Sequence, residues 1–145
     1  MKRNTRGFTL VEILIVVIIL GILAAIVIPQ FTNASNDARN NSIASTLQTT
    51  RSQIELFKIQ HADTPPAATA LSVVLTGKTN QADTTQTAAT GTLGPYVQAF
   101  PVNPVNGFST VVNAAGSAAG WVYTVTGGQY TISATDTTGT GTLTY

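Results

Sequence analysis

The chain has no cysteine and only one histidine. The absence of cysteine excludes disulfide bonds, thiolate metal sites and thiol catalysis. The single histidine, His61, lies beside Asp63 at a predicted helix end, which is typical of a solvated cap rather than of a catalyst or a metal ligand. No nucleophile motif flanks any serine, and no glycine-rich phosphate loop precedes a helix. The sequence therefore predicts no enzymatic activity, no metal site and no cofactor.

Charge is also scarce, because only 9% of the residues are charged and the formal net charge is +1. Three of the basic residues, Lys2, Arg3 and Arg6, precede a long apolar run, and the others are scattered along the chain. A surface that binds nucleic acid needs basic residues gathered on one face. We therefore expect no nucleic-acid partner.

The apolar run extends from Phe8 to Ile28. As an α-helix it would be about 31 Å long, which matches the hydrocarbon core of a bilayer. The basic residues before it favour a cytoplasmic location for the start of the chain. The residues after this single-pass helix are then expected on the periplasmic side. The alternative is an ordinary secretory signal cleaved near Ala24-Ala25. The run is longer than the apolar part of such a signal, and its helical pattern continues beyond it.

One carboxylate, that of Glu12, lies inside this run near its start. A lone carboxylate in hydrocarbon costs on the order of a few kcal/mol, so a chain that keeps one there is expected to pair it with a cation. The alternative is a side chain that reaches back from the helix end to the membrane surface.

The residues around this carboxylate carry a family resemblance. The run Gly-Phe-Thr-Leu-Val-Glu at residues 7–12, followed by an apolar helix through Pro29, resembles the prepilin signature of type IV pilins and type II secretion pseudopilins. The resemblance implies that prepilin peptidase cuts between Gly7 and Phe8 and methylates the new amine of Phe8. It further implies that Glu12 of one subunit neutralises the Phe8 amine of a neighbouring subunit.

The same resemblance implies a leader over residues 1–7 and a set of partners. Lipid of the bacterial inner membrane would surround the helix before assembly. An inner-membrane assembly platform would then add the subunit to a helical homo-oligomer, which becomes an extracytoplasmic or cell-surface filament. Some major pseudopilins hold calcium in an acidic late loop. Here Asp136 is the single acidic residue after the predicted hairpin, so we expect no such site.

Gly21 and Pro29 interrupt the apolar run. Proline lacks an N–H and clashes with the preceding turn, so the helix is expected to kink near Pro29 or to stretch between the two residues. The family implies local melting of this segment in the filament. A static kink is the other interpretation, and the sequence leaves both open.

The helix is predicted to continue as an amphipathic half, because Ile43, Leu47, Ile54 and Phe57 recur on one helical face. Thr64-Pro65-Pro66 cannot continue a helix, so the end is expected between residues 60 and 63. After the leader, the chain thus divides into a transmembrane and polymerisation helix (8–29), an amphipathic half (30–63) and a small β-rich head (64–145).

The head contains the clearest strand pattern. Residues 121–126 and 129–134 flank Gly127-Gly128, which is typical of a tight hairpin turn. Residues 67–75 are predicted to include a helical turn, residues 108–113 a third strand, and residues 137–144 an edge strand or a tail. The expected hairpin register places Trp121 opposite Ala134, Tyr123 opposite Ile132, and Val125 opposite Tyr130. The fold class is therefore α+β and pilin-like, with a small antiparallel sheet packed on the long helix.

These patterns together indicate a structural subunit of a type IV pilus or a type II secretion pseudopilus, and the sequence does not separate the two filaments. The alternative is a signal-anchored periplasmic binding module that does not polymerise. This alternative requires an intact leader and predicts that a substitution of Glu12 has no effect.

Overall fold

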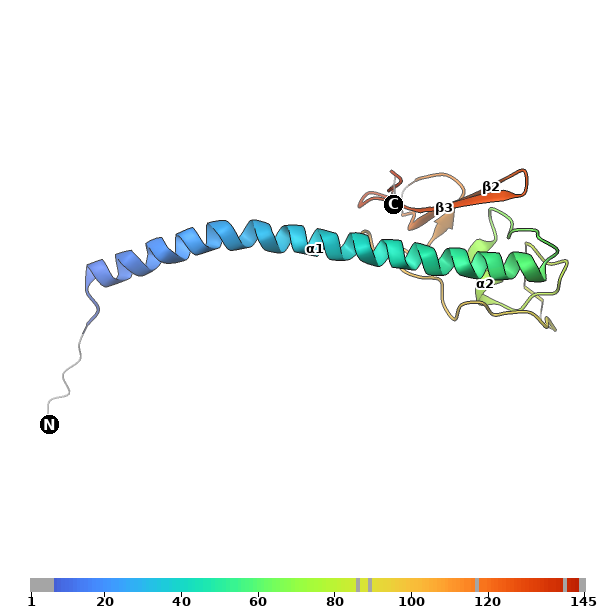
Figure 1. Ribbon diagram of the computed structural model, residues 1–145, viewed down its shortest axis with the longest axis horizontal. Helices are drawn as coiled ribbons and strands as arrows, with labels where there is room; N and C mark the ends of the chain where they lie inside the picture. Colours follow the sequence, from blue (N-terminus) through green and yellow to red (C-terminus); the bar gives the residue numbers. More distant parts are fainter. Residues whose placement is uncertain (1–6, 86, 89, 117, 140, 144–145) are drawn as a thin grey trace, which may run out of the picture. The chain divides into compact units, whose positions relative to one another are not determined.

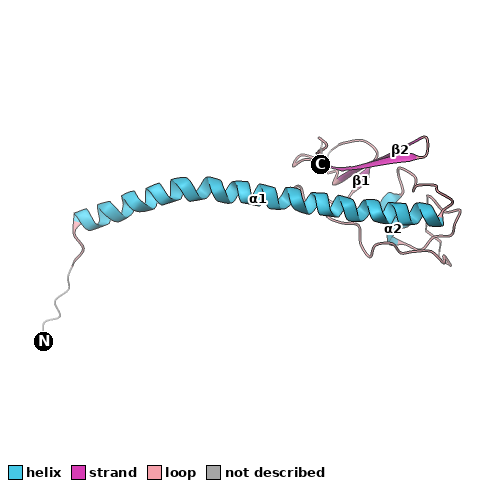
Figure 2. Cartoon of the chain, in the orientation of Figure 1, coloured by secondary structure: helices cyan, strands magenta, loops and turns pink. Residues whose placement is uncertain are grey.

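The computed structural model describes residues 7–85, 87–88, 90–116, 118–139 and 141–143. The basic residues Lys2, Arg3 and Arg6 lie outside the described residues. Within the described ranges, two helices are followed by three strands, in the order α1, α2, β1, β2, β3 (Figures 1 and 2). The chain forms two compact units, which divide between Ala38 and Arg39.

Helix α1 extends from Leu10 to Gln60, which confirms the long N-terminal helix. It is continuous through Gly21 and Pro29, and the kink between them stays a prediction. The helix ends where the backbone takes left-handed torsions at Ala62 and Asp63, with φ of 53° and 60°. The amide of Asp63 donates to the carbonyl of Lys58 at 2.8 Å, so the last turn keeps a hydrogen-bond partner before the two prolines.

The first unit exposes an apolar surface over residues 8–28, because every described residue from Gly7 to Ser42 is exposed and nearly all residues of that stretch are apolar. Its helical part is long and apolar enough to cross a membrane. In water such a surface would be strongly unfavourable, so this unit requires lipid or other apolar helices around it.

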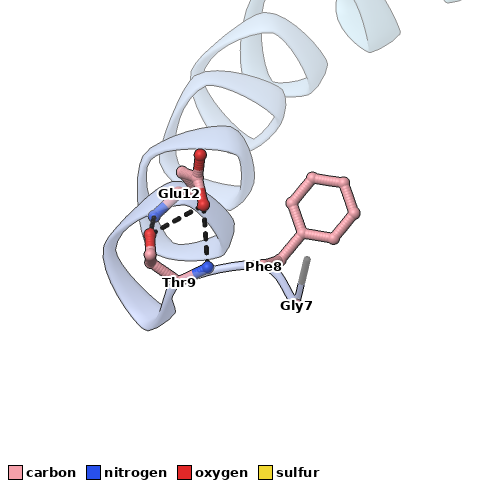
Figure 3. Close-up of a pocket in the computed structure, with 4 residues that line it drawn as sticks. All are labelled: Gly7, Phe8, Thr9 and Glu12. Atoms are coloured by element: carbon pink, nitrogen blue, oxygen red, sulfur yellow. Dashed lines mark hydrogen bonds between the residues drawn. The ribbon is translucent and has the colours of Figure 1, made fainter. Parts of the chain in front are cut away.

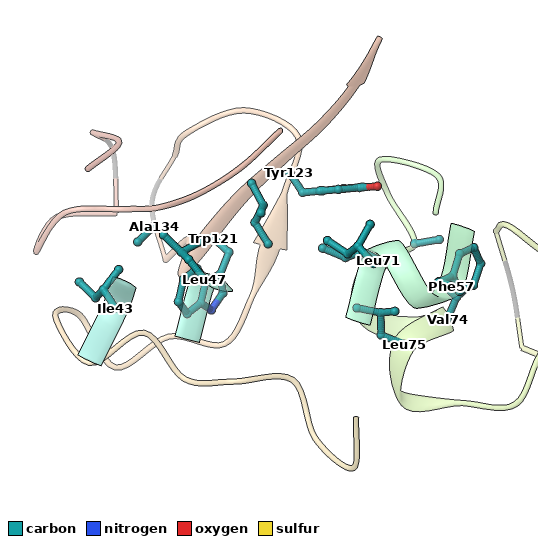
Figure 4. Packing of buried hydrophobic residues seen from close by; sticks show 12 residues of the cluster. Ile43, Leu47, Phe57, Leu71, Val74, Leu75, Trp121, Tyr123 and Ala134 are labelled. Carbon is teal, nitrogen blue, oxygen red and sulfur yellow. The ribbon is translucent and has the colours of Figure 1, made fainter. Parts of the chain in front are cut away.

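The second unit buries one face of α1, as the sequence predicted. Ile43, Leu47, Ile54 and Phe57 are each at most 1% exposed. They pack against α2 (Leu71–Thr76) and against the inner face of the hairpin (Figure 4). The other buried apolar members of this core are Leu71, Val74, Leu75, Trp121, Tyr123, Ile132, Ala70 and Ala134.

The hairpin is formed by β2 (Trp121–Thr126) and β3 (Gln129–Ala134). All three predicted cross-strand pairs are confirmed. Gly127 and Gly128 have φ of 58° and 79°, the left-handed torsions that a tight hairpin turn of this twist requires. Beyond β3, the amide of Leu143 donates to Ala134 O at 2.8 Å, and Thr135 and Thr142 form an isolated antiparallel bridge. No strand forms among the described residues of the segment predicted as an edge strand or a tail, of which Thr140 and Thr144 lie outside the described residues.

The third strand differs from the prediction. Strand β1 comprises only Val111–Val112 and pairs with β2 in parallel, so the sheet is mixed rather than antiparallel. The eight-residue loop after β1 lets the chain return to the start of β2 and run in the same direction. Gly120 permits this path, because a Cβ there would overlap the carbonyl of Phe108.

The prediction of a solvated His61 is wrong. Its side chain is 1% exposed, and its ring stacks on that of Phe57 with centroids 3.6 Å apart. Nδ1 lies 2.8 Å from the carbonyl of Phe57, and Nε2 lies 3.1 Å from the hydroxyl of Thr79. Because a carbonyl can only accept, Nδ1 carries the proton and Nε2 accepts from Thr79 in the neutral ring. His61 is therefore a satisfied core residue at the end of α1.

The tyrosines of the head should make its stability sensitive to alkaline pH. Burial raises the pKa of Tyr130 to about 12, and burial likewise raises the pKa values of Tyr96 and Tyr123. A folded-state pKa above the unfolded value of about 10 means that the fold favours the neutral phenol. The stability that these neutral tyrosines contribute should therefore be fully present below about pH 10 and should be lost as the pH rises toward 12. Urea midpoints measured across this range test the expectation, and Tyr130→Phe should make the decline shallower.

Candidate functional site

The candidate site lies at the start of α1, where Gly7, Phe8, Thr9 and Glu12 line an open pocket (Figure 3). One carboxylate oxygen of Glu12, Oε2, accepts from the backbone amide of Thr9 at 2.7 Å and from its hydroxyl at 2.8 Å. The amide of Glu12 in turn donates to the hydroxyl of Thr9 at 3.2 Å. This reciprocal arrangement is a capping box, in which two side chains satisfy amides that the first helical turn leaves without partners.

The capping box fixes the direction of the Glu12 side chain. The carboxylate is turned back toward the beginning of the chain, on the side where the backbone of Phe8 enters the helix (Figure 3). The ring of Phe8 points away from the carboxylate and is 84% exposed. The negative charge therefore lies at the amide of Thr9, one residue after Phe8, whose bond to Gly7 is the one at which the sequence predicts cleavage.

Glu12 has hydrogen-bond donors but no cation beside it in the described part of the chain. The ion pairs found there join Lys58 to Glu55 at 3.4 Å and to Asp63 at 3.5 Å, in the second unit. Oε1 of Glu12 accepts no hydrogen bond from any described residue. A carboxylate at the edge of an apolar helix with one oxygen available and no counter-ion is suited to bind a cation from outside the subunit.

The structure brings together three of the predicted site residues, Gly7, Phe8 and Glu12. Gly21 and Pro29 lie further along α1 and do not contribute to the pocket. Thr9 was not predicted to act here. The pattern threonine-x-x-glutamate immediately before an apolar helix is a sequence signal that could have identified it. Within the described ranges, no group of three His, Asp or Glu side chains is placed to hold a metal ion.

Comparison with known proteins connects this end of the chain to a methylation motif. Residues 2–28 match the family model described as the prokaryotic N-terminal methylation motif. The chain is 28% identical to type II secretion system core protein G of Dickeya chrysanthemi over 104 residues, which cover 72% of this chain and 65% of that protein. It is also 28% identical to core protein G of Pseudomonas aeruginosa over 103 residues, covering 71% of this chain and 70% of that protein.

A relative of a second kind is the type IV narrow pilus major component PilA5 of Thermus thermophilus. It is 34% identical over 62 residues, which cover 43% of this chain and 53% of that protein. The chain spans between 53% and 65% of the length of the first three curated relatives that it matches. No solved structure matches it.

Proposed function

Because the chain belongs to the family of type IV pilins and type II secretion pseudopilins, we propose that it is a structural subunit of a helical filament. The subunit is cut between Gly7 and Phe8 by prepilin peptidase, is methylated at the amine of Phe8, and assembles through α1. The observation that supports this most strongly is the Glu12 carboxylate, which is held toward the start of the chain by Thr9 and has no counter-ion among the described residues.

Cleavage would supply the missing cation. It converts the amide nitrogen of Phe8 into an α-amine, which has a reference pKa of about 7.7–8.0 and is largely protonated at neutral pH. Either charge alone is costly in hydrocarbon, but the two become tolerable when they are paired. In a filament the amine of one subunit meets Glu12 of its neighbour, and a subunit out of register would leave both groups unpaired.

The exposed apolar surface of α1 supports the same mechanism. Before assembly, lipid of the inner membrane would cover residues 8–28, and afterwards the helices of neighbouring subunits would replace the lipid. Exchange of one apolar surrounding for another changes little free energy, so packing and the charge pair would decide where a subunit docks. An inner-membrane assembly platform would supply the new subunits, and the head would face the periplasm.

The similarity to type II secretion core protein G favours a secretion pseudopilus over a pilus. That match covers 72% of the chain, whereas the match to the Thermus pilin covers 43%. The two filaments can be distinguished by shearing cells and probing the released material. A pilus subunit should be abundant in the sheared fraction at normal expression, and a pseudopilus subunit should stay with the cells.

The processing step is tested by the intact mass of the protein purified from membranes. We expect a chain that begins at Phe8 and carries one additional methyl group. Gly7→Val should leave the chain uncut, because a branched side chain beside the scissile bond obstructs an extended fit in a narrow active site.

Gly21→Val is the matched control for this variant. A Cβ at either glycine meets no atom within 4 Å, so both positions have open space for the first atom of the new side chain. The control should be processed like the natural chain. A full-length natural chain, or a chain that begins beyond Ile28, would overturn the proposed function.

A further inference from the structure

The loop before β1 contains two asparagines whose side chains connect it to both ends of the hairpin. Nδ2 of Asn103, a fully buried residue, donates to the carbonyls of Gly120 at 2.8 Å and Thr135 at 2.9 Å. Nδ2 of Asn106 faces three acceptors, which are the carbonyl of Ala119 at 2.9 Å, the hydroxyl of Thr135 at 2.8 Å and the carbonyl of Asp136 at 2.9 Å. We call Asn106 together with Ala119, Thr135 and Asp136 the Asn106 clasp.

The two asparagines differ in the residue that follows each. Asn103 precedes Pro104, whereas Asn106 precedes Gly107, and no other asparagine in the chain precedes glycine. An asparagine loses its side-chain amide group when the backbone nitrogen of the next residue attacks its Cγ atom. Proline offers no N–H for this step, and glycine offers one that no side chain shields. Asn106 is therefore the asparagine most open to this reaction once the loop is free.

The folded head keeps the nitrogen of Gly107 and the Cγ atom of Asn106 apart through hydrogen bonds. The amide of Gly107 donates to the carbonyl of Asn103 at 2.8 Å, so the nucleophile is already hydrogen-bonded. Oδ1 of Asn106 accepts from the amide of Phe108 at 3.1 Å, and its Nδ2 is held by the clasp. Cγ of Asn106 thus cannot approach the nitrogen of Gly107 unless these hydrogen bonds break.

We propose that Asn106-Gly107 is a self-modification site that records opening of the head. When the loop opens, the nitrogen of Gly107 loses its proton and forms a bond to Cγ of Asn106. The bond from Cγ to Nδ2 breaks, and ammonia leaves with that proton. Water then hydrolyses the cyclic imide at either carbonyl, which gives aspartate or isoaspartate at position 106. No oxidant or reductant is needed, and the loss of ammonia makes the change permanent.

The product does not fit the clasp. A carboxylate at position 106 would present oxygen to the carbonyls of Ala119 and Asp136, which lie at 2.9 Å and can only accept, so two hydrogen bonds that connect the loop to the sheet would be replaced by repulsive contacts. Isoaspartate would also lengthen the backbone by one atom. A head that opens for long enough is therefore prevented from closing in the same way again.

The rate of the reaction in folded and unfolded protein tests the proposal. The full-length chain in detergent micelles is incubated in mildly alkaline buffer with and without urea, and conversion at each asparagine is followed by peptide mass mapping. Conversion at Asn106 should be at least about tenfold slower in the folded protein, because it requires local opening. Asn113, which is exposed and precedes Ala114, is the internal control and should convert at similar rates in both. Equal rates at Asn106 in the two conditions would overturn the proposal.

A second measurement tests the consequence of the modification. Asn106→Asp reproduces the product without the alkaline incubation and should lower the urea midpoint of the head. Asn113→Asp places the same charge on an exposed loop residue and should leave the midpoint unchanged. Equal midpoints for Asn106→Asp and the natural chain would show that the clasp can accept a carboxylate, and the proposed irreversibility would then be wrong.

Discussion

Filaments are expected to disappear when Glu12 is replaced by glutamine. Glutamine keeps a side-chain oxygen of the same reach, so the capping box with Thr9 can persist and α1 should begin as before. The substitution removes only the charge, and the Phe8 amine of the neighbour would then have no counter-ion in apolar surroundings. Breaking a buried pair by removal of one partner costs about 3–5 kcal/mol, which corresponds to at least a hundredfold loss in the association equilibrium.

Assembly should be measured as filaments recovered by shearing from cells that overexpress each variant. Membrane content and intact mass should be measured on the same cells, because both must stay normal for the result to report on assembly. Glu55→Gln is the matched control. It removes one negative charge from an exposed position of the same helix, where the ion pair with Lys58 contributes at most about 1 kcal/mol. Normal filaments from Glu12→Gln would refute the pairing role.

The elements that were predicted correctly depend on local signals. The 3.6-residue period placed Ile43, Leu47, Ile54 and Phe57 on the buried face of α1 without reference to any other segment. The hairpin register followed from Gly127-Gly128, because a two-residue turn fixes which residues lie opposite each other. Where neighbours in sequence decide the structure, the sequence was sufficient.

The errors share a different cause, which is contact between distant segments. The parallel pairing of β1 depends on a close passage of Gly120 against Phe108. The burial of His61 depends on Thr79, which lies 18 residues away. No periodicity in the sequence encodes such pairings, so a lone histidine at a helix end gave no sign that a later loop covers it.

The candidate site was predictable for the same reason that the hairpin was. Gly7, Phe8, Thr9 and Glu12 lie within six consecutive residues, and their arrangement is set by the first turn of α1. The contribution of Thr9 is the part that the structure added. It explains how Glu12 is directed toward the chain start before any neighbouring subunit is present.

Replacement of Phe57 by alanine is expected to cost the head about 3–5 kcal/mol of unfolding free energy. Phe57 is fully buried, stacks on His61 and meets the ring of Tyr96 edge-on at 5.4 Å between centroids. The smaller side chain removes the stacking partner of His61 and leaves a cavity that rigid neighbours cannot fill. Because a small domain has about 5–15 kcal/mol in total, this single change should remove a large share of the stability.

Leu56→Ala is the matched control, since it shortens the preceding residue of the same helix at a position that is 42% exposed. Leucine and alanine are both good helix formers, so this variant should change the unfolding free energy by no more than about 0.5 kcal/mol. Urea unfolding of the full chain in detergent, followed by the fluorescence of Trp121, gives both values. Equal losses at the two positions would mean that the head does not depend on the buried face of α1, and the packing of Phe57 with His61 and Tyr96 would then contribute nothing specific to its stability.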